Sequence, residues 1–100
     1  MTAWISNSVP IRHDVGLHAR PSVKLTKLAK TFAAVIEIAG EPDGPWINAK
    51  SIVKVMAMKA KQDSILYVRA EGADAAAAVA ALKELVERDF DEDAAHAASG

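Results

Sequence analysis

The feature of this sequence that most restricts its fold is the alternation of short strand-like runs with longer helix-like runs within 100 residues. Apolar and polar residues alternate in the strand-like runs, whereas apolar residues recur every three or four positions in the helix-like runs. A chain this short cannot cover both faces of a sheet with helices. We therefore predict an α+β domain in which helices pack on one face of an antiparallel sheet.

The expected order of elements is strand, helix, strand, strand, helix, strand, helix. Pro21 fits only the first turn of a helix, so the first helix is expected to begin around Ala19 or Arg20. Ser51 precedes an apolar run that favours a short second helix. The patterns indicate the boundaries 3–12, 19–32, 33–40, a short strand around Trp46 and Ile47, 51–58, 63–70 and 73–90.

Two of the expected helices carry apolar stripes that should face the core. The stripe of the first helix consists of Pro21, Leu25, Leu28, Ala29 and Phe32. The stripe of the last helix consists of Val79, Leu82 and Val86. Asp74 lies near the start of the last helix, where an acidic side chain complements the helix dipole.

The composition excludes several classes of protein. The chain has no cysteine, which excludes disulfides, thiolate metal sites and cysteine nucleophiles. Its net charge of -1 gives no broad attraction to nucleic acid or to an anionic membrane. No basic leader or bilayer-length apolar run is present, so we expect a cytoplasmic protein without membrane insertion. We expect one domain over residues 1–90, followed by a flexible acidic tail or linker stub over 91–100.

The stretch GLHARP, residues 16–21, joins a glycine turn to the expected start of the first helix. The amino end of a helix presents unpaired N–H groups and favours an anion such as phosphate. His18 could be a nucleophile there, because positive surroundings favour the neutral imidazole that attacks phosphorus. Arg20 adds a forked donor for phosphate oxygens. On these residues alone another interpretation stays open, in which His18 is a partial cap or an exposed polar residue.

GLHARP, the segment AKSI at 49–52 and the alanine-rich last helix resemble the HPr family over about residues 4–90. This family comprises the histidine-containing phosphocarriers of the bacterial phosphoenolpyruvate-dependent sugar phosphotransferase system. The resemblance implies an open-faced β-sandwich of four antiparallel strands and three helices on one face, in the order βαββαβα. It also implies that His18 accepts a phosphoryl group on Nδ1 from phospho-enzyme I, that Arg20 steadies this group, and that IIA proteins receive it in sugar uptake and regulation. No cofactor, metal or independent small-molecule enzyme activity is expected, and we expect a monomer.

The solvent side of the first helix is predicted to be a docking surface. Val23 shares a face with Lys27 and Lys30, away from the apolar stripe. A small apolar spot among basic side chains suits brief contact with an acidic partner surface. The alternative is a solvated basic face with one stray valine.

The segment around Ser51 is expected to complete this surface. Residues 51–58 include more apolar side chains than one core face can use, so some of them must be exposed. Ser51 itself is either the N-cap of the helix or, by resemblance, a residue that an HPr serine kinase/phosphorylase modifies to weaken docking to enzyme I. By the same resemblance, the second half of the partner-binding surface comprises Lys50, Ile52, Val53 and Lys54.

Several other functions compete with this one. The chain could serve the nitrogen-regulatory branch or be the carrier domain of a multidomain phosphotransferase protein. A hydrolytic or acid/base enzyme would need an orienting carboxylate, and Asp14 is the only acid close in sequence to His18. A regulatory binding module would use the helix face and leave the histidine idle. His13 could join His18 on a metal, but a third suitable ligand is lacking nearby.

Two stretches depart from the pattern of the family. Many members have glycines where this chain has Lys59 and Asp63, so the turn after the second helix is expected to differ. The hairpin turn EPDGP, residues 41–45, with Trp46 after it, is longer and bulkier than usual. These departures bear on which IIA partners the chain serves.

Overall fold

The chain folds into the seven elements that its sequence predicts, in the predicted order. The structure, a computed structural model, describes residues 4–11, 19–58 and 64–88. The elements are β1 (Ile5–Pro10), α1 (Ala19–Ala29), β2 (Val35–Ala39), β3 (Ile47–Asn48), α2 (Ile52–Met58), β4 (Ile65–Glu71) and α3 (Ala75–Glu87). Within these ranges no helix has the length and apolar character needed to cross a bilayer.

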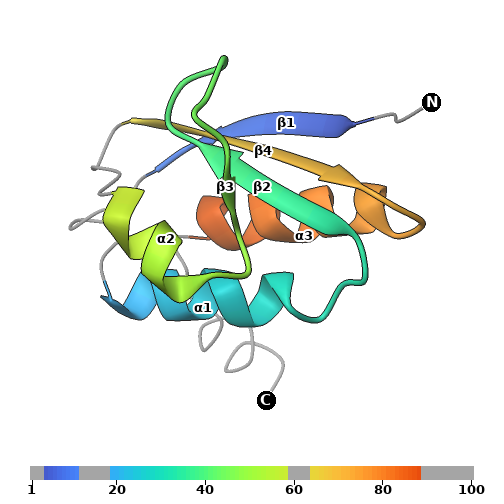
Figure 1. Ribbon diagram of the computed structural model, residues 1–100, viewed down its shortest axis with the longest axis horizontal. Helices are drawn as coiled ribbons and strands as arrows, with labels where there is room; N and C mark the ends of the chain where they lie inside the picture. The colour runs from blue at the N-terminus through green and yellow to red at the C-terminus, as the bar shows by residue number, and fades with distance from the viewer. Residues whose placement is uncertain (1–3, 12–18, 59–63, 89–100) are drawn as a thin grey trace.

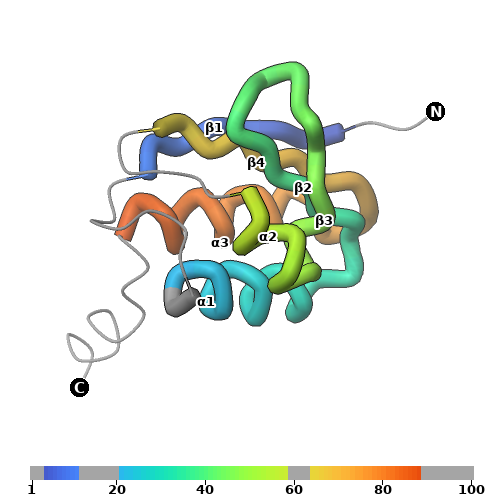
Figure 2. The backbone as a smooth tube through the Cα atoms, turned by 60° about the vertical axis from the view of Figure 1, so that its left-hand side comes forward, coloured from blue at the N-terminus to red at the C-terminus, as the bar shows by residue number. Residues whose placement is uncertain are grey.

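The four strands form one antiparallel sheet in the order β1-β4-β2-β3. Figure 1 shows the three helices on one face of this sheet, and the view in Figure 2, turned by 60°, shows the same two layers. The predicted open-faced sandwich is therefore confirmed. β1 and β3 lie at the two edges, so the first strand of the chain and the hairpin strand are separated by β4 and β2.

The core lies between the sheet and the helix layer. Alternate residues of the strands point into it, as the period of two predicts, and α3 packs across β1, β4 and β2. The buried strand residues are Val9, Ile36, Ile38, Ala39, Leu66, Val68 and Ala70. The stripe predicted for α3 is buried together with Ala75, Ala78 and Leu85. Each fully buried large aliphatic side chain contributes about 1.5–3 kcal/mol.

The predicted core stripe of α1 is confirmed and extends further than its apolar residues indicate. Leu25 and Ala29 are fully buried, and Leu28 and Phe32 pack partly buried against the core. Thr26 is also buried, and its Oγ1 donates a hydrogen bond to the Ser22 carbonyl at 3.0 Å. This bond satisfies the hydroxyl within the helix, so a polar residue fits the buried face.

Side chains from two distant parts of the chain hold the turn between α1 and β2. The Asp74 carboxylate accepts hydrogen bonds from the N–H groups of Ala33 at 2.9 Å and Ala34 at 2.8 Å. The Lys50 ammonium donates to the Phe32 carbonyl at 2.8 Å. Asp74 occupies the N-cap position of α3, yet its side chain makes no capping bond there. It joins the start of α3 to the end of α1.

Gly72 lets the turn between β4 and α3 pack closely against the turn between α1 and β2. Its φ is +137°, in the region that favours glycine. A Cβ atom at this position would lie 3.0 Å from the Ala34 Cα atom. A larger residue would be strained and would also push the two turns apart.

A cluster around Arg69 ties the open face of the sheet together. The Arg69 Nε and Nη2 atoms donate to one Glu37 carboxylate oxygen at 2.9 and 2.6 Å. The guanidinium carbon lies 4.3 Å from the ring centroid of Trp4 and 4.2 Å from that of Trp46. Each cation–π contact contributes about 0.5–1 kcal/mol when exposed. Because Trp4 precedes β1 and Trp46 precedes β3, this cluster connects the two edges of the sheet across β4 and β2.

The hydrogen bonds to Asp74 make the stability of the fold depend on pH. The Ala33 N–H is the largest cause that lowers the pKa of Asp74, and the Ala34 N–H and the Lys50 charge act in the same direction against the effect of desolvation. A group whose pKa is lowered by folding stabilises the folded state above its unfolded-state pKa, about 3.9 for aspartate. This contribution is lost as the pH falls through the lower folded-state pKa.

We therefore predict that Asp74→Asn lowers the free energy of unfolding at pH 7, because an amide offers one acceptor oxygen in place of two. The difference from the wild type should shrink as the pH falls below about 3.9. Denaturant unfolding of both proteins between pH 7 and pH 2.5 measures it. Asp43→Asn, at an exposed acid of the hairpin, is the matched control and should change little. A difference that stays constant with pH would contradict this role of Asp74.

Candidate functional site

The predicted phosphoryl site lies at the start of α1, and the structure describes its helical side. α1 begins at Ala19, as the position of Pro21 predicts, and Pro21 is buried in its first turn. The first turn contains no acidic residue, so no carboxylate there offsets the positive end of the helix dipole. His18 lies outside the described residues. Arg20 is the second residue of α1, but its side chain also lies outside the described part of the chain.

The predicted docking residues of α1 lie on its solvent side. Val23 is 45% exposed, and Lys27 and Lys30 are also exposed. Leu25 and Ala29 are fully buried on the other side of the helix. α1 and Lys30, the residue that follows it, therefore present an apolar side chain and two ammonium groups to solvent, as the pattern predicts. The partner of this face remains a proposal.

α2 exposes apolar side chains as well. Val53 is 74% exposed, the largest fraction among the exposed large apolar residues of the described chain, and Lys54 beside it is exposed. Val55 is fully buried, whereas Ile52 is half-buried and Met56 is 42% exposed. The sequence predicts that some apolar side chains of residues 51–58 are exposed. The structure turns Met56 outward, and this residue joins Val53 on the exposed side.

The two helices with these residues are neighbours. α1 and α2 pack against each other, and they lie side by side in Figures 1 and 2. The 11 residues of α1 span about 15 Å at the usual helical rise. A partner of ordinary size can therefore contact both helices together with the start of α1.

Ser51 and Lys50 lie toward the end of α1 and away from its start, because the Lys50 ammonium bonds the Phe32 carbonyl. Ser51 is the N-cap of α2, and its Oγ accepts a hydrogen bond from the Lys54 N–H at 3.4 Å. The capping interpretation is thus observed.

Lys50 differs from the other predicted docking residues because it has an internal partner. Its side chain is half-buried, and its positive charge also lowers the pKa of Asp74. The resemblance pointed to a docking role for Lys50. The structure adds a structural role that no local pattern indicated, because Phe32 lies 18 positions earlier in the chain.

Some predictions fall outside the described residues. These are the metal possibility at His13, the orienting role of Asp14, and the turn that contains Lys59 and Asp63. Within the described ranges no group of three His, Cys, Asp or Glu side chains could hold a metal ion.

Comparison with known proteins shows the family of this chain. The PTS-HPr family model, described as the PTS HPr component phosphorylation site, matches residues 5–88. The chain belongs to the HPr family. Among HPr relatives, the phosphocarrier protein HPr of Xylella fastidiosa (strain Temecula1) is 35% identical over 89 residues, which cover 89% of this chain and 98% of that protein.

Solved HPr structures share the fold as well. The crystal structure of HPr from Thermoanaerobacter tengcongensis matches with a TM-score of 0.80 and 34% identity, covering 89% of this chain and 98% of that one. A multiphosphoryl transfer protein of Vibrio cholerae is 44% identical over 73 residues, which cover 72% of this chain. The aligned part is only 18% of that longer protein. HPr-type sequence thus occurs both as a small protein and within a longer one.

Lys50 donates an internal hydrogen bond, whereas Lys54 is exposed. We therefore predict that replacing Lys50 destabilises this HPr-family chain more than replacing Lys54. Lys50→Met removes the donor to the Phe32 carbonyl and should lower the free energy of unfolding by about 1 kcal/mol. This corresponds to a fall of about 4–8 °C in Tm for a domain of this size. Lys54→Met, at an exposed position, is the matched control and should leave Tm nearly unchanged. Equal Tm values for the two variants would contradict the structural role of Lys50.

Proposed function

We propose that this phosphocarrier of the phosphotransferase system carries its phosphoryl group on His18. It accepts the group from phospho-enzyme I and passes it to a IIA protein. The observation that carries the proposal is the family match over residues 5–88, which contains GLHARP at the start of α1. Membership of the HPr family supports partners within the phosphotransferase system.

The chemistry requires a neutral imidazole and donors for the phosphoryl oxygens. The Nδ1 lone pair of His18 attacks phosphorus, a P–N bond forms, and the bond between phosphorus and the donor breaks with its electron pair left on the donor. Arg20 and the unpaired N–H groups of the first turn of α1 stabilise the charged phosphoryl oxygens. The second transfer repeats this exchange, with the acceptor protein as nucleophile and His18 as leaving group.

The docking surface of the proposal consists of the exposed sides of α1 and α2. Three basic side chains, Lys27, Lys30 and Lys54, are exposed on or beside these helices. Val23 and Val53 add exposed apolar side chains to the same two helices. Positive charge raises the rate of encounter with acidic partners, and a small apolar area allows rapid release. A carrier that must leave one partner before it meets the next needs both properties.

The cellular setting belongs to the same proposal. We place the carrier in the cytoplasm as a monomer, with a carrier domain over residues 1–90 and an acidic tail over 91–100. A second candidate is the carrier domain of a multidomain phosphotransferase protein. It is supported by the 44% identity to a longer protein of which the aligned part is 18%.

Replacement of single histidines tests the proposal. The chain has three histidines, so His13→Ala and His96→Ala are matched controls for His18→Ala. With enzyme I and labelled phosphoenolpyruvate, the wild type and both controls should take up acid-labile, alkali-stable label, because phosphohistidine has that stability. His18→Ala should take up none. An unlabelled wild type, or a labelled His18→Ala variant, would contradict the assignment to His18.

A negative charge at Ser51 tests the docking surface and the proposed regulation by a serine kinase. Asp is also a good N-cap, so Ser51→Asp should keep α2 intact. A like charge facing an acidic partner costs about 1 kcal/mol in water-like surroundings, which slows phosphorylation of His18 by enzyme I roughly fivefold. Ser51→Ala, which adds no charge, should be phosphorylated at nearly the wild-type rate. If both variants match the wild type, Ser51 does not lie at the docking surface.

A further inference from the structure

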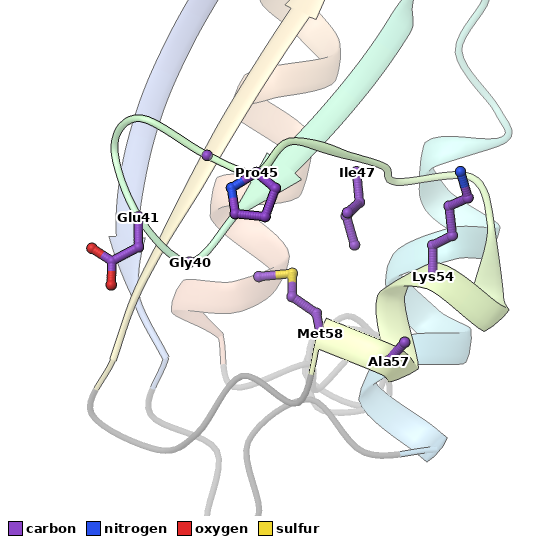
Figure 3. A pocket seen from close by; sticks show the side chains of 8 residues that line it. Gly40, Glu41, Pro45, Ile47, Lys54, Ala57 and Met58 are labelled. Carbon is purple, nitrogen blue, oxygen red and sulfur yellow. The ribbon is translucent and has the colours of Figure 1, made fainter.

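A pocket between the β2–β3 hairpin and α2 lies beside the predicted docking surface and shares Lys54 with it. Figure 3 shows Pro45 and Ile47 on the hairpin side and Ala57 and Met58 on the helix side. The pocket has a volume of about 440 Å³. Its lining residues are Gly40, Glu41, Gly44, Pro45, Ile47, Lys54, Ala57 and Met58.

The lining chemistry suits an apolar group. Ile47 and Met58 are partly buried and pack against the core, so the inner part of the pocket is apolar and fixed. Glu41 and Lys54, the charged residues among the described lining, are exposed and lie at opposite ends of the pocket in Figure 3. Small-ligand sites combine an apolar lining with a few polar groups placed to orient the ligand. Among its described lining residues no polar side chain is buried, whereas an apolar anchor from a protein partner needs none.

The pocket is continuous with the docking surface of α2. Lys54 belongs to both, and Val53 and Met56 are exposed on the same helix. Val53 and the lining residue Ala57 are four positions apart in α2 and therefore neighbours on its surface, so a partner that covers Val53 lies beside the pocket. The Lys54 ammonium at its end attracts a carboxylate beside the entering apolar side chain.

The hairpin wall of the pocket is held in place before any partner binds. The Gly44 N–H donates to the Glu41 carbonyl at 3.0 Å, which closes the turn. Trp46 is stacked on Arg69, with its ring centroid 4.2 Å from the guanidinium carbon. Such preorganisation lowers the entropy cost of binding. The longer hairpin turn of this chain thus forms one preorganised wall of the pocket.

We propose that this pocket receives an apolar side chain, with a carboxylate next to it, from a protein partner in phosphoryl transfer. The hairpin thereby selects which phosphotransferase proteins this carrier serves. The proposal rests on the proposed function, and it adds a specificity pocket to the docking surface. Ala57 is the residue best placed to test it, because it is exposed, lies in a helix and lines the pocket.

The experiment uses the full chain with purified enzyme I and, separately, purified IIA proteins, and it measures binding and methyl NMR spectra. The Met58 ε-methyl and Ile47 δ1-methyl resonances of the wild type should shift when at least one of these partners binds. Ala57→Leu places a larger side chain at the pocket and should raise the Kd for that partner roughly tenfold, as expected when an anchor site is obstructed. Ala80→Leu, at an exposed position of α3, is the matched control and should bind like the wild type.

Labelling of His18 in the same samples separates the two proposals. An unlabelled wild type would overturn the proposed function and this inference with it. A labelled wild type whose Met58 and Ile47 methyl resonances stay unchanged with every partner would overturn the pocket alone. So would an Ala57→Leu variant that binds each partner with the wild-type Kd.

Discussion

The helix layer depends on one short turn, the segment between α1 and β2. Asp74 accepts two backbone hydrogen bonds in this turn and Lys50 donates a third, so the starts of α3 and α2 are both fixed to the end of α1. Gly72 allows the close approach that these bonds require. Since the predicted phosphoryl site lies at the other end of α1, the position of that end relative to α2 follows from this turn.

Much of this fold could be predicted because its elements follow local periodicities. The apolar stripe of α1, the alternation in β4 and the first-turn position of Pro21 each involve residues only a few positions apart. Asp74 and Arg69 could not be interpreted in this way. Asp74 bonds to backbone groups 40 and 41 positions away, and Arg69 contacts side chains that precede the two edge strands. Contacts of this kind leave no periodic signal in the sequence.

The exposed faces of the helices, the role of His18 and the hairpin pocket could be predicted from the sequence to different degrees. Excess apolar residues indicated that α1 and α2 have exposed faces, and Val23 and Val53 are exposed. The residues around His18 predict only that the start of α1 can bind an anion. The carrier function follows from the family match. The outward position of Met56 and the hairpin pocket required the tertiary structure. Both depend on the packing of α2 against the hairpin. The sequence of either segment alone does not determine this packing.

We propose that phosphoryl chemistry takes place at the start of α1, whereas α1, α2 and the hairpin select the partner. The central claim is that one imidazole carries the phosphoryl group. The most direct measurement is 15N and 31P NMR of the full chain, labelled at its histidines and phosphorylated by enzyme I and phosphoenolpyruvate. The account predicts phosphorus bonded to Nδ1 of His18, with the resonances of His13 and His96 showing no phosphorus coupling. Phosphorus on another residue, or no phosphohistidine at all, would contradict it.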